Sequence, residues 1–158
     1  MTFCKWSYEL PLPRSLAYPK NLQTLGDHVR ARRLDLGLLQ RDVAHLLGVS
    51  TATVWNWESH TNHPTRPRPV ARIIEFLGYC PLPPPTTHGE AIRYTRMIRG
   101  LNFKEAAAEI GVDPTTLLIW ERDEGRPNDA RCRGKLQNWL VANVNLLQSN
   151  SPESKPMA

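Results

Sequence analysis

The sequence predicts an all-α protein built from two small helical bundles in tandem. The first reason is an internal repeat: shifted by 63 positions, residues 26–77 align with residues 89–140 without a gap, and 14 of the 52 aligned positions are identical. Self-similarity at a fixed period indicates copies of one structural unit. The second reason is that each copy has apolar residues at helical spacing, separated by Gly and Pro residues that end helices.

The repeat sets the expected domain boundaries. They are an irregular N-terminal arm over 1–23, a first domain over 24–79, a proline-rich linker over 80–88, a second domain over 89–145 and a disordered tail over 146–158. Because residues 83–85 are all proline, the linker should be stiff and extended, with a reach of roughly 25–28 Å at about 3.1 Å per residue.

The first domain should contain four helices. We expect them over residues 24–36, 39–47, 51–58 and 72–77. Thr24 and Asp27 form a capping-box pattern at the start of the first helix, and Ser50 can cap the third. Prolines at 64, 67 and 69 predict a loop before the fourth helix.

The second domain repeats these signals. Thr87 with Glu90 forms another capping box, and Asn102 can cap the next helix together with Glu105. Asp113 followed by proline is typical of a helix start. The last helix, expected over 129–145, should be longer than its counterpart in the first domain.

Composition narrows the class of protein without deciding it. The formal net charge of +5 is compatible with nucleic-acid binding, but many other proteins are as basic. Cys4, Cys80 and Cys132 are odd in number and scattered, which fits a reducing cytosol. No run is apolar enough for a signal peptide or a membrane span. We therefore expect a cytoplasmic, nucleoid-associated protein.

Residues 40–58 carry the most specific motif. They predict a helix, a tight turn that contains glycine, and a second helix. Ala44 is a small residue where the two helices of the motif would cross, and Gly48 permits the turn. Trp57 and Glu58 lie at the end of the third helix of the domain. This stretch resembles the phage-repressor (Cro/lambda-repressor-like, Xre-type) helix-turn-helix family. The resemblance covers about 52 residues in each copy and implies a lambda-repressor-like helix-turn-helix in each bundle.

The resemblance implies a sequence-specific DNA-binding transcriptional regulator, with the third helix of the first domain in the major groove. The candidate DNA-binding residues are Gln40, Arg41, Ser50, Thr51, Ala52, Thr53, Trp55, Asn56, Arg66 and Arg68. Asn56 could pair with adenine and Ala52 could contact a thymine methyl group. In the family, the position of Gln40 meets phosphate or a base edge, and the arginines would contact phosphates.

Other prominent residues have structural explanations. Trp57 and Trp120 occupy buried positions of the pattern and should be core residues. Arg30, Arg32 and Arg33 should form a solvated helix face.

The second copy departs from the motif where DNA would be read. Phe103 replaces Gln40, and Pro114, Leu118 and Ile119 replace Thr51, Trp55 and Asn56. Acidic residues at 113, 121, 123 and 124 would surround its third helix and repel phosphates. This copy should therefore fold but read bases poorly, and exposed Leu118 and Ile119 would suit a protein contact. Weak DNA contact by this copy stays open through its basic residues Lys104, Arg126, Arg131 and Arg133.

Catalytic and metal sites are not expected. His60, His63 and Cys80 match no common zinc spacing, and no nucleophile or phosphate-binding motif is present. We expect no enzyme activity, no cofactor, no membrane contact and no small-molecule substrate. Double-stranded DNA is the expected partner. A homodimer or a protein partner remains open, as does the alternative of a protein-interaction adaptor or antitoxin-like protein that uses the second domain.

Overall fold

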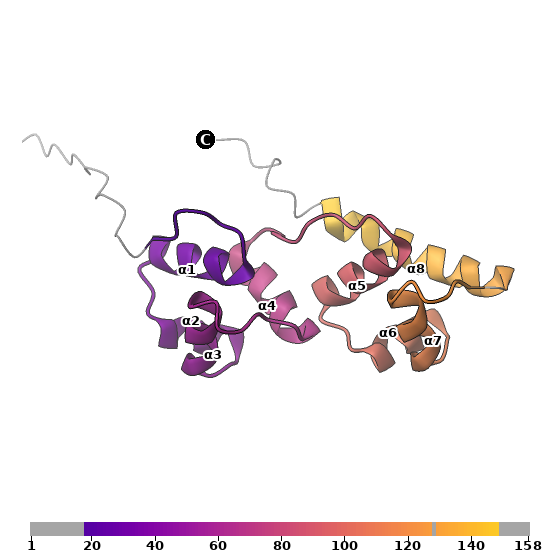
Figure 1. The fold of residues 1–158 in the computed structure, drawn as a ribbon, viewed down its shortest axis with the longest axis horizontal. Helices are drawn as coiled ribbons and strands as arrows, with labels where there is room; N and C mark the ends of the chain where they lie inside the picture. Colours follow the sequence, from indigo (N-terminus) through magenta and orange to yellow (C-terminus); the bar gives the residue numbers. More distant parts are fainter. Residues whose placement is uncertain (1–17, 128, 149–158) are drawn as a thin grey trace, which may run out of the picture.

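The computed structural model describes residues 18–127 and 129–148, and every regular element in these ranges is an α-helix (Figure 1). The helices are α1 (Leu25–Asp35), α2 (Gln40–Leu47), α3 (Thr51–Glu58), α4 (Pro67–Leu77), α5 (His88–Arg99), α6 (Phe103–Ile110), α7 (Pro114–Glu121) and α8 (Ala130–Gln148). The predicted all-α class is confirmed. Residues 1–17 of the predicted arm and 149–158 of the predicted tail lie outside the described residues.

Two predicted helix boundaries were wrong, for different reasons. Helix α4 begins at Pro67, five residues earlier than expected, with proline at its first position. The N–H groups of a first helical turn have no acceptor within the helix, so proline costs little there. Helix α8 continues to Gln148, into the predicted tail. Gly78 ends α4 with a φ of 78°, whereas the aligned residue of α8 is Val141, which lets the helix continue.

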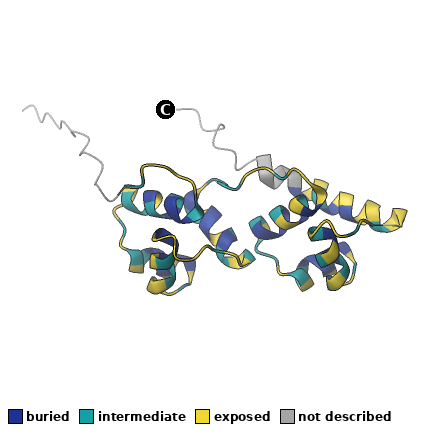
Figure 2. Ribbon diagram, viewed as in Figure 1, coloured by how far each residue is buried: buried dark blue, intermediate teal, exposed yellow. Residues whose placement is uncertain are grey.

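Each half of the chain has its own apolar core. Helices α1–α4 bury Val29, Val43, Ala44, Leu47, Val54, Trp57, Ile73 and Leu77. Helices α5–α8 bury Ile92, Ala106, Ala107, Ile110, Leu117, Trp120, Leu136 and Trp139. The buried faces point inward in each half (Figure 2). The prediction that Trp57 and Trp120 are core residues is confirmed. We refer to α1–α4 as the first unit and α5–α8 as the second unit.

In both units the first helix lies against the end of the third helix, and glycine makes this approach possible. A Cβ atom on Gly26 would lie 1.9 Å from the backbone oxygen of Trp57. The aligned Gly89 would place a Cβ atom 2.6 Å from the backbone oxygen of Glu121. Such distances are far below van der Waals contact. The glycine identity in the repeat is therefore a packing requirement.

A buried ion pair joins the same two helices in each unit. In the first unit Arg33 donates to both carboxylate oxygens of Glu58, at 2.6 and 2.7 Å. In the second unit Arg96 donates to both oxygens of Glu121, at 2.8 Å each. Each arginine also donates to the backbone oxygen of the residue five positions later in the chain. This paired, bidentate geometry satisfies the charges as they are buried.

These pairs correct two sequence-based expectations. The side chain of Arg33 is only 13% exposed, so it is not part of a solvated face. Glu121 is 9% exposed and neutralised by Arg96, so it does not add to a negative surface around α7. The repeat shows the arginine and the glutamate of each pair as identical polar positions, but it does not show that they contact each other.

The two units pack directly against each other through α4 and α5. Val70 and Ile74 of α4 are buried with Met97 of α5, and Leu82 of the linker packs on this cluster. The linker prolines also line an apolar cavity of about 390 Å³ between the units. The linker is therefore not a free spacer, and helix packing sets the separation of the units.

No helix in the described part of the chain is both long and apolar enough to cross a membrane.

We expect Gly26→Ala to destabilise the protein by about 3 kcal/mol or more, because the new methyl group must displace the backbone of α3. Gly134→Ala is the matched control: this glycine lies inside α8, and a Cβ atom added there would have no neighbouring atom within 4 Å. Alanine there should stabilise the helix by roughly 0.5–1 kcal/mol. Urea unfolding measures both. Equal effects of the two substitutions would contradict the packing account.

Glu58→Gln should cost about 3–5 kcal/mol, because it leaves the Arg33 charge buried without its partner. Replacing both Arg33 and Glu58 by methionine should recover most of this loss, since no uncompensated charge remains. Chemical denaturation of the two variants tests this, with exposed Glu124→Gln as control. A single substitution as mild as the control would show that the pair contributes little.

Candidate nucleic-acid interface

The turn between α2 and α3 depends on Gly48, which ends α2 in the left-handed conformation with a φ of 65°. A Cβ atom there would also lie 2.1 Å from the guanidinium of Arg72. Arg72 extends from α4 and donates to the backbone oxygen of Leu47, at 2.9 Å. The second unit has a similar contact one residue further along, because Lys135 donates to the backbone oxygen of Gly111 at 3.3 Å. A basic side chain thus covers the end of the second helix in both units.

Helix α3 matches its predicted bounds, and its Ser50 cap is confirmed. The Ser50 hydroxyl accepts from the backbone N–H of Thr53 at 3.1 Å and lies 2.8 Å from the Thr53 hydroxyl. Val54 and Trp57 are buried in the core. This anchoring leaves one face of the helix to the outside.

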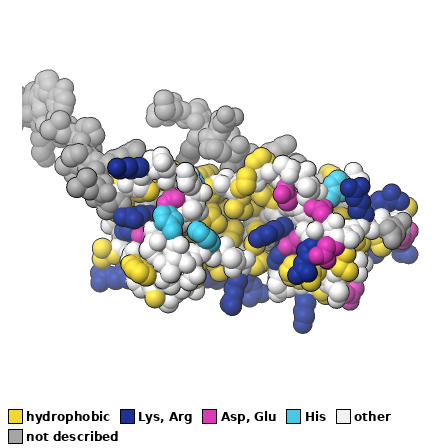
Figure 3. Space-filling view, in the orientation of Figure 1, with side chains coloured by type: hydrophobic (Ala, Val, Ile, Leu, Met, Phe, Trp, Pro, Cys, Tyr) yellow, Lys and Arg dark blue, Asp and Glu magenta, His cyan; other side chains and the backbone are white. Residues whose placement is uncertain are grey.

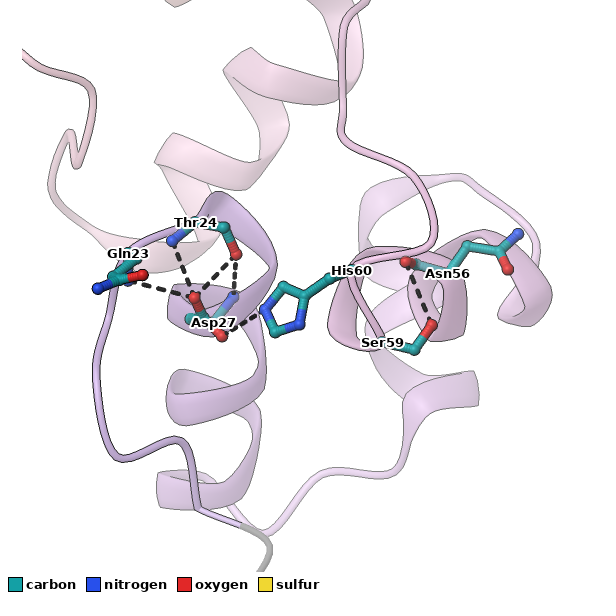
Figure 4. Close-up of polar contacts among 6 residues, drawn as sticks. All are labelled: Gln23, Thr24, Asp27, Asn56, Ser59 and His60. Carbon is teal, nitrogen blue, oxygen red and sulfur yellow. Dashed lines mark hydrogen bonds and ion pairs between the residues drawn. The ribbon is translucent and has the colours of Figure 1, made fainter.

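That outer face is formed by most of the predicted base-facing residues. Thr51, Ala52 and Trp55 are exposed, while Thr53 and Asn56 are half-buried. Trp55 is 54% exposed, which is unusual for so large an apolar side chain. The carboxamide of Asn56 points away from the neighbouring polar contacts (Figure 4) and makes no side-chain hydrogen bond within the described residues. Its hydrogen-bonding groups are therefore available.

The remaining predicted contact residues fall into two groups. Arg41 is 75% exposed, with Asp42 3.6 Å away as its partner, and Arg66 is exposed at the start of α4. Gln40 instead donates its amide to the buried carboxylate of Glu58 at 2.9 Å. Arg68 donates to Glu105 of the second unit at 2.7 Å. Gln40 thus supports the buried ion pair, whereas the side chain of Arg68 is 73% exposed and its ion pair lies at the surface.

Sequence reasoning missed Arg72 at this site. Arg72 aligns with Lys135, so the positive charge is kept at this position although the residue type differs. That kept charge was the signal available in the sequence. Arg72 is exposed and lies against the turn of the motif. It adds a further positive charge beside the start of α3.

The end of α3 is tied to the start of α1 by His60 (Figure 4). His60 adopts a left-handed backbone conformation, with a φ of 60°, and its Nε2 lies 2.8 Å from Oδ1 of Asp27. Asp27 also accepts from the backbone and hydroxyl of Thr24, at 2.9 Å each. This network fixes the orientation of α3 relative to α1. His60 thus has a structural role, although its side chain is 51% exposed.

The second unit keeps this tie with different chemistry. Asp123 aligns with His60 and has a φ of 56°. It accepts from the hydroxyl of Thr87 at 2.7 Å and from the backbone N–H of Gly89 at 3.1 Å. The hydrogen bond from the Thr87 hydroxyl is the largest contribution that lowers the pKa of Asp123. Asp113 is similarly engaged, since it caps α7 through the N–H of Thr115.

The outer face of the third helix carries different residues in the second unit. Phe103, in place of Gln40, packs under the guanidinium of Arg96, with 4.0 Å between the Cζ atom and the ring centre. The expectation that Leu118 is exposed was wrong, because it is half-buried. Ile119 is 40% exposed, and Gly125 lies close against it. The apolar surface of α7 is therefore smaller than the sequence suggested.

In Figure 3, Lys and Arg side chains project at several separate points along the lower edge of the molecule, the side on which Figure 1 places α2, α3, α6 and α7. Acidic side chains are more frequent over the second unit in the same view. Within the described ranges, no cluster of His, Cys, Asp and Glu side chains could hold a metal ion.

No family model, curated protein or solved structure matches this chain. The geometry of α2, α3 and their surroundings therefore carries the functional argument.

Acid should remove the stabilisation that Asp27 provides. Burial disfavours its ionised form, but hydrogen bonds from Thr24, His60 and Gln23 outweigh this and lower its pKa from the ordinary 3.8. A lowered folded-state pKa gives stability that is present above the unfolded-state pKa and is lost as pH falls through the folded-state pKa. The stability difference between wild type and Asp27→Asn should thus be largest above about pH 5 and shrink below about pH 4.

Urea unfolding at several pH values measures this difference, with exposed Glu75→Gln as the control for a carboxylate without such bonds. A difference that stays constant down to about pH 2, below the ordinary range of a carboxyl pKa, would contradict the assignment.

Proposed function

We propose that this chain is a sequence-specific DNA-binding transcriptional regulator whose first unit reads the major groove through α3. The observation that carries the proposal is the division of α3 into two faces. Val54 and Trp57 anchor one face in the core, while the other presents short side chains and an unengaged carboxamide. A helix with this outer face can approach base edges closely in the major groove.

Each outer residue has a role that its chemistry allows. Asn56 is suited to bidentate hydrogen bonding with adenine, and Ala52 to contact with a thymine methyl group. Thr51 can donate to a base edge or a phosphate. Trp55 adds apolar contact to sugars or methyl groups from its exposed ring. Together these residues would read a short sequence along one edge of the groove.

Positive side chains around α3 support the same function. Arg41, Arg66 and Arg72 are exposed beside the motif and would neutralise phosphates on either side of the groove. We also propose that the chain is related to the Xre-type family. The same proposal includes a cytoplasmic, nucleoid-associated location and no enzymatic activity.

A second candidate is a protein-interaction adaptor or antitoxin-like protein that uses α7. The exposed Ile119, at the position of Asn56, favours it. The half-buried Leu118 leaves a smaller apolar patch than such a contact normally uses. A co-purifying partner that is lost when Leu118 and Ile119 are both changed to Asp would support this alternative.

Asn56→Ala should weaken binding to the preferred DNA sequence by about tenfold or more, since a good bidentate pair is worth roughly 1–3 kcal/mol. Binding to unrelated DNA should change little, because phosphate contacts remain. Selection from random duplexes with the full chain first defines the sequence, and titration of labelled duplexes then gives both affinities.

Ile119→Ala, at the aligned position of the second unit, is the matched control and should leave sequence preference unchanged. Equal losses for the two variants would show that α3 does not have the special role proposed for it. A chain that enriches no sequence would contradict the proposed function.

A further inference from the structure

We propose that one chain binds one DNA duplex at an asymmetric site, with the second unit contacting the DNA backbone on one fixed side of the sequence that α3 reads. This inference rests on the proposed function and adds a direction to its target. Dimeric helix-turn-helix proteins bind pseudo-palindromic sites because a two-fold axis relates their units. The contacts between the two units of this chain exclude such an axis.

The interface joins surfaces that are not equivalent in the repeat. Helix α4 of the first unit packs on α5 of the second. The 63-residue shift pairs α4 with α8 and α5 with α1, so a two-fold arrangement would repeat the contact of α4 with α5 as a contact of α1 with α8. Among the described residues, α8 packs instead on α5 and α6 of its own unit. A two-fold interface uses the same patch on both partners. The two units are therefore arranged head to tail and point in the same direction along the chain.

The head-to-tail contact is confined to two units. Val70 and Ile74, buried in the interface, align with Arg133 and Gln137, which are exposed on α8. On the opposite surface, Met97 aligns with the half-buried Leu34, and Ile98 aligns with the exposed Asp35. A further unit packed on α8 would thus meet Arg133 and Gln137 where this interface has apolar residues.

Close contacts fix how the two motifs are oriented. A Cβ atom added to Gly100 would lie only 3.1 Å from the Cβ atom of Ala71, so the two units lie close together at this point. Arg68, at the start of α4, bonds to Glu105 in the first turn of α6, and Glu105 also accepts from the backbone N–H of Asn102 at 2.8 Å. Both helix-turn-helix motifs lie on the same side of the molecule (Figure 1).

The second unit keeps a phosphate-binding charge without the means to read bases. Lys104 occupies the position of Arg41, is exposed, and forms no ion pair within the described residues. Phe103, packed against Arg96, takes the place of the amide side chain of Gln40. Backbone contacts hold a protein on DNA without carrying sequence information. The complete footprint should thus be a read sequence followed, on one side only, by DNA of any sequence.

The test uses full-length chain and duplexes that carry its selected sequence with about twelve additional base pairs on one side, on the other, or on both, roughly one helical turn. We expect one flank to strengthen binding about 3–10-fold and the other to have no effect, with one chain per duplex. Lys104→Ala should abolish this flank advantage and lower the salt dependence by about one phosphate contact. Lys20→Ala, on the segment before α1 at the opposite side of the molecule (Figure 1), is the matched control and should preserve the advantage.

The outcomes separate this inference from the function beneath it. A palindromic selected site that binds two chains, equal gains from both flanks, or no gain from either would overturn the asymmetric site while leaving DNA reading by α3 intact. A flank advantage that survives Lys104→Ala would overturn the role of the second unit. Failure to enrich any sequence would overturn the proposed function, and this inference with it.

Discussion

The buried Arg–Glu pair between the first and third helices is the interaction on which the rest of each unit depends. It places a guanidinium and a carboxylate in the small apolar core of a unit that has little surface to bury. Such a pair is tolerated only when both charges have their full set of hydrogen bonds. The first helix, the turn after it and the end of the third helix supply these bonds, so they must form together. Arg33 holds Glu58, and Glu58 in turn holds Gln40. The exposed face of α3 is therefore presented by a network that begins in the core.

The sequence predicted the helices well because the signals that begin and end them are local. Ser50 and Asp113 cap the starts of α3 and α7, as their residue types indicate. Glycines in the left-handed conformation end four other helices, α2, α4, α5 and α6. The errors arose where a local signal has two meanings. Proline interrupts a helix interior but is favoured in the first turn, where the backbone N–H has no hydrogen-bond acceptor within the helix, and Pro67 lies in such a first turn. Burial of Leu118 and the contact between Arg68 and Glu105 depend on the packing of distant segments, which residue spacing does not report.

The candidate site was partly predictable for the same reason. Periodicity separates the buried Val54 and Trp57 from their exposed neighbours, so it identified the outer face of α3. It could not distinguish a polar residue that is available from one already bonded in the fold. Gln40 and Arg33 looked like surface groups, yet both bond to Glu58. The two copies also show that one scaffold carries different surfaces: the pairs that build it recur at aligned positions, whereas the residues at the outer face of the third helix differ.

The difference between Gly78 and Val141 bears on how such chains could be lengthened. Glycine at the end of α4 lets the backbone leave the helix and begin another unit, while valine at the aligned position carries α8 onward for another seven residues to Gln148. A designer who wanted a three-unit array would need a glycine at 141 and apolar residues at 133 and 137, followed by a copy of the proline linker. Array length in this architecture is thus set by a few side chains on one helix, and the core need not change.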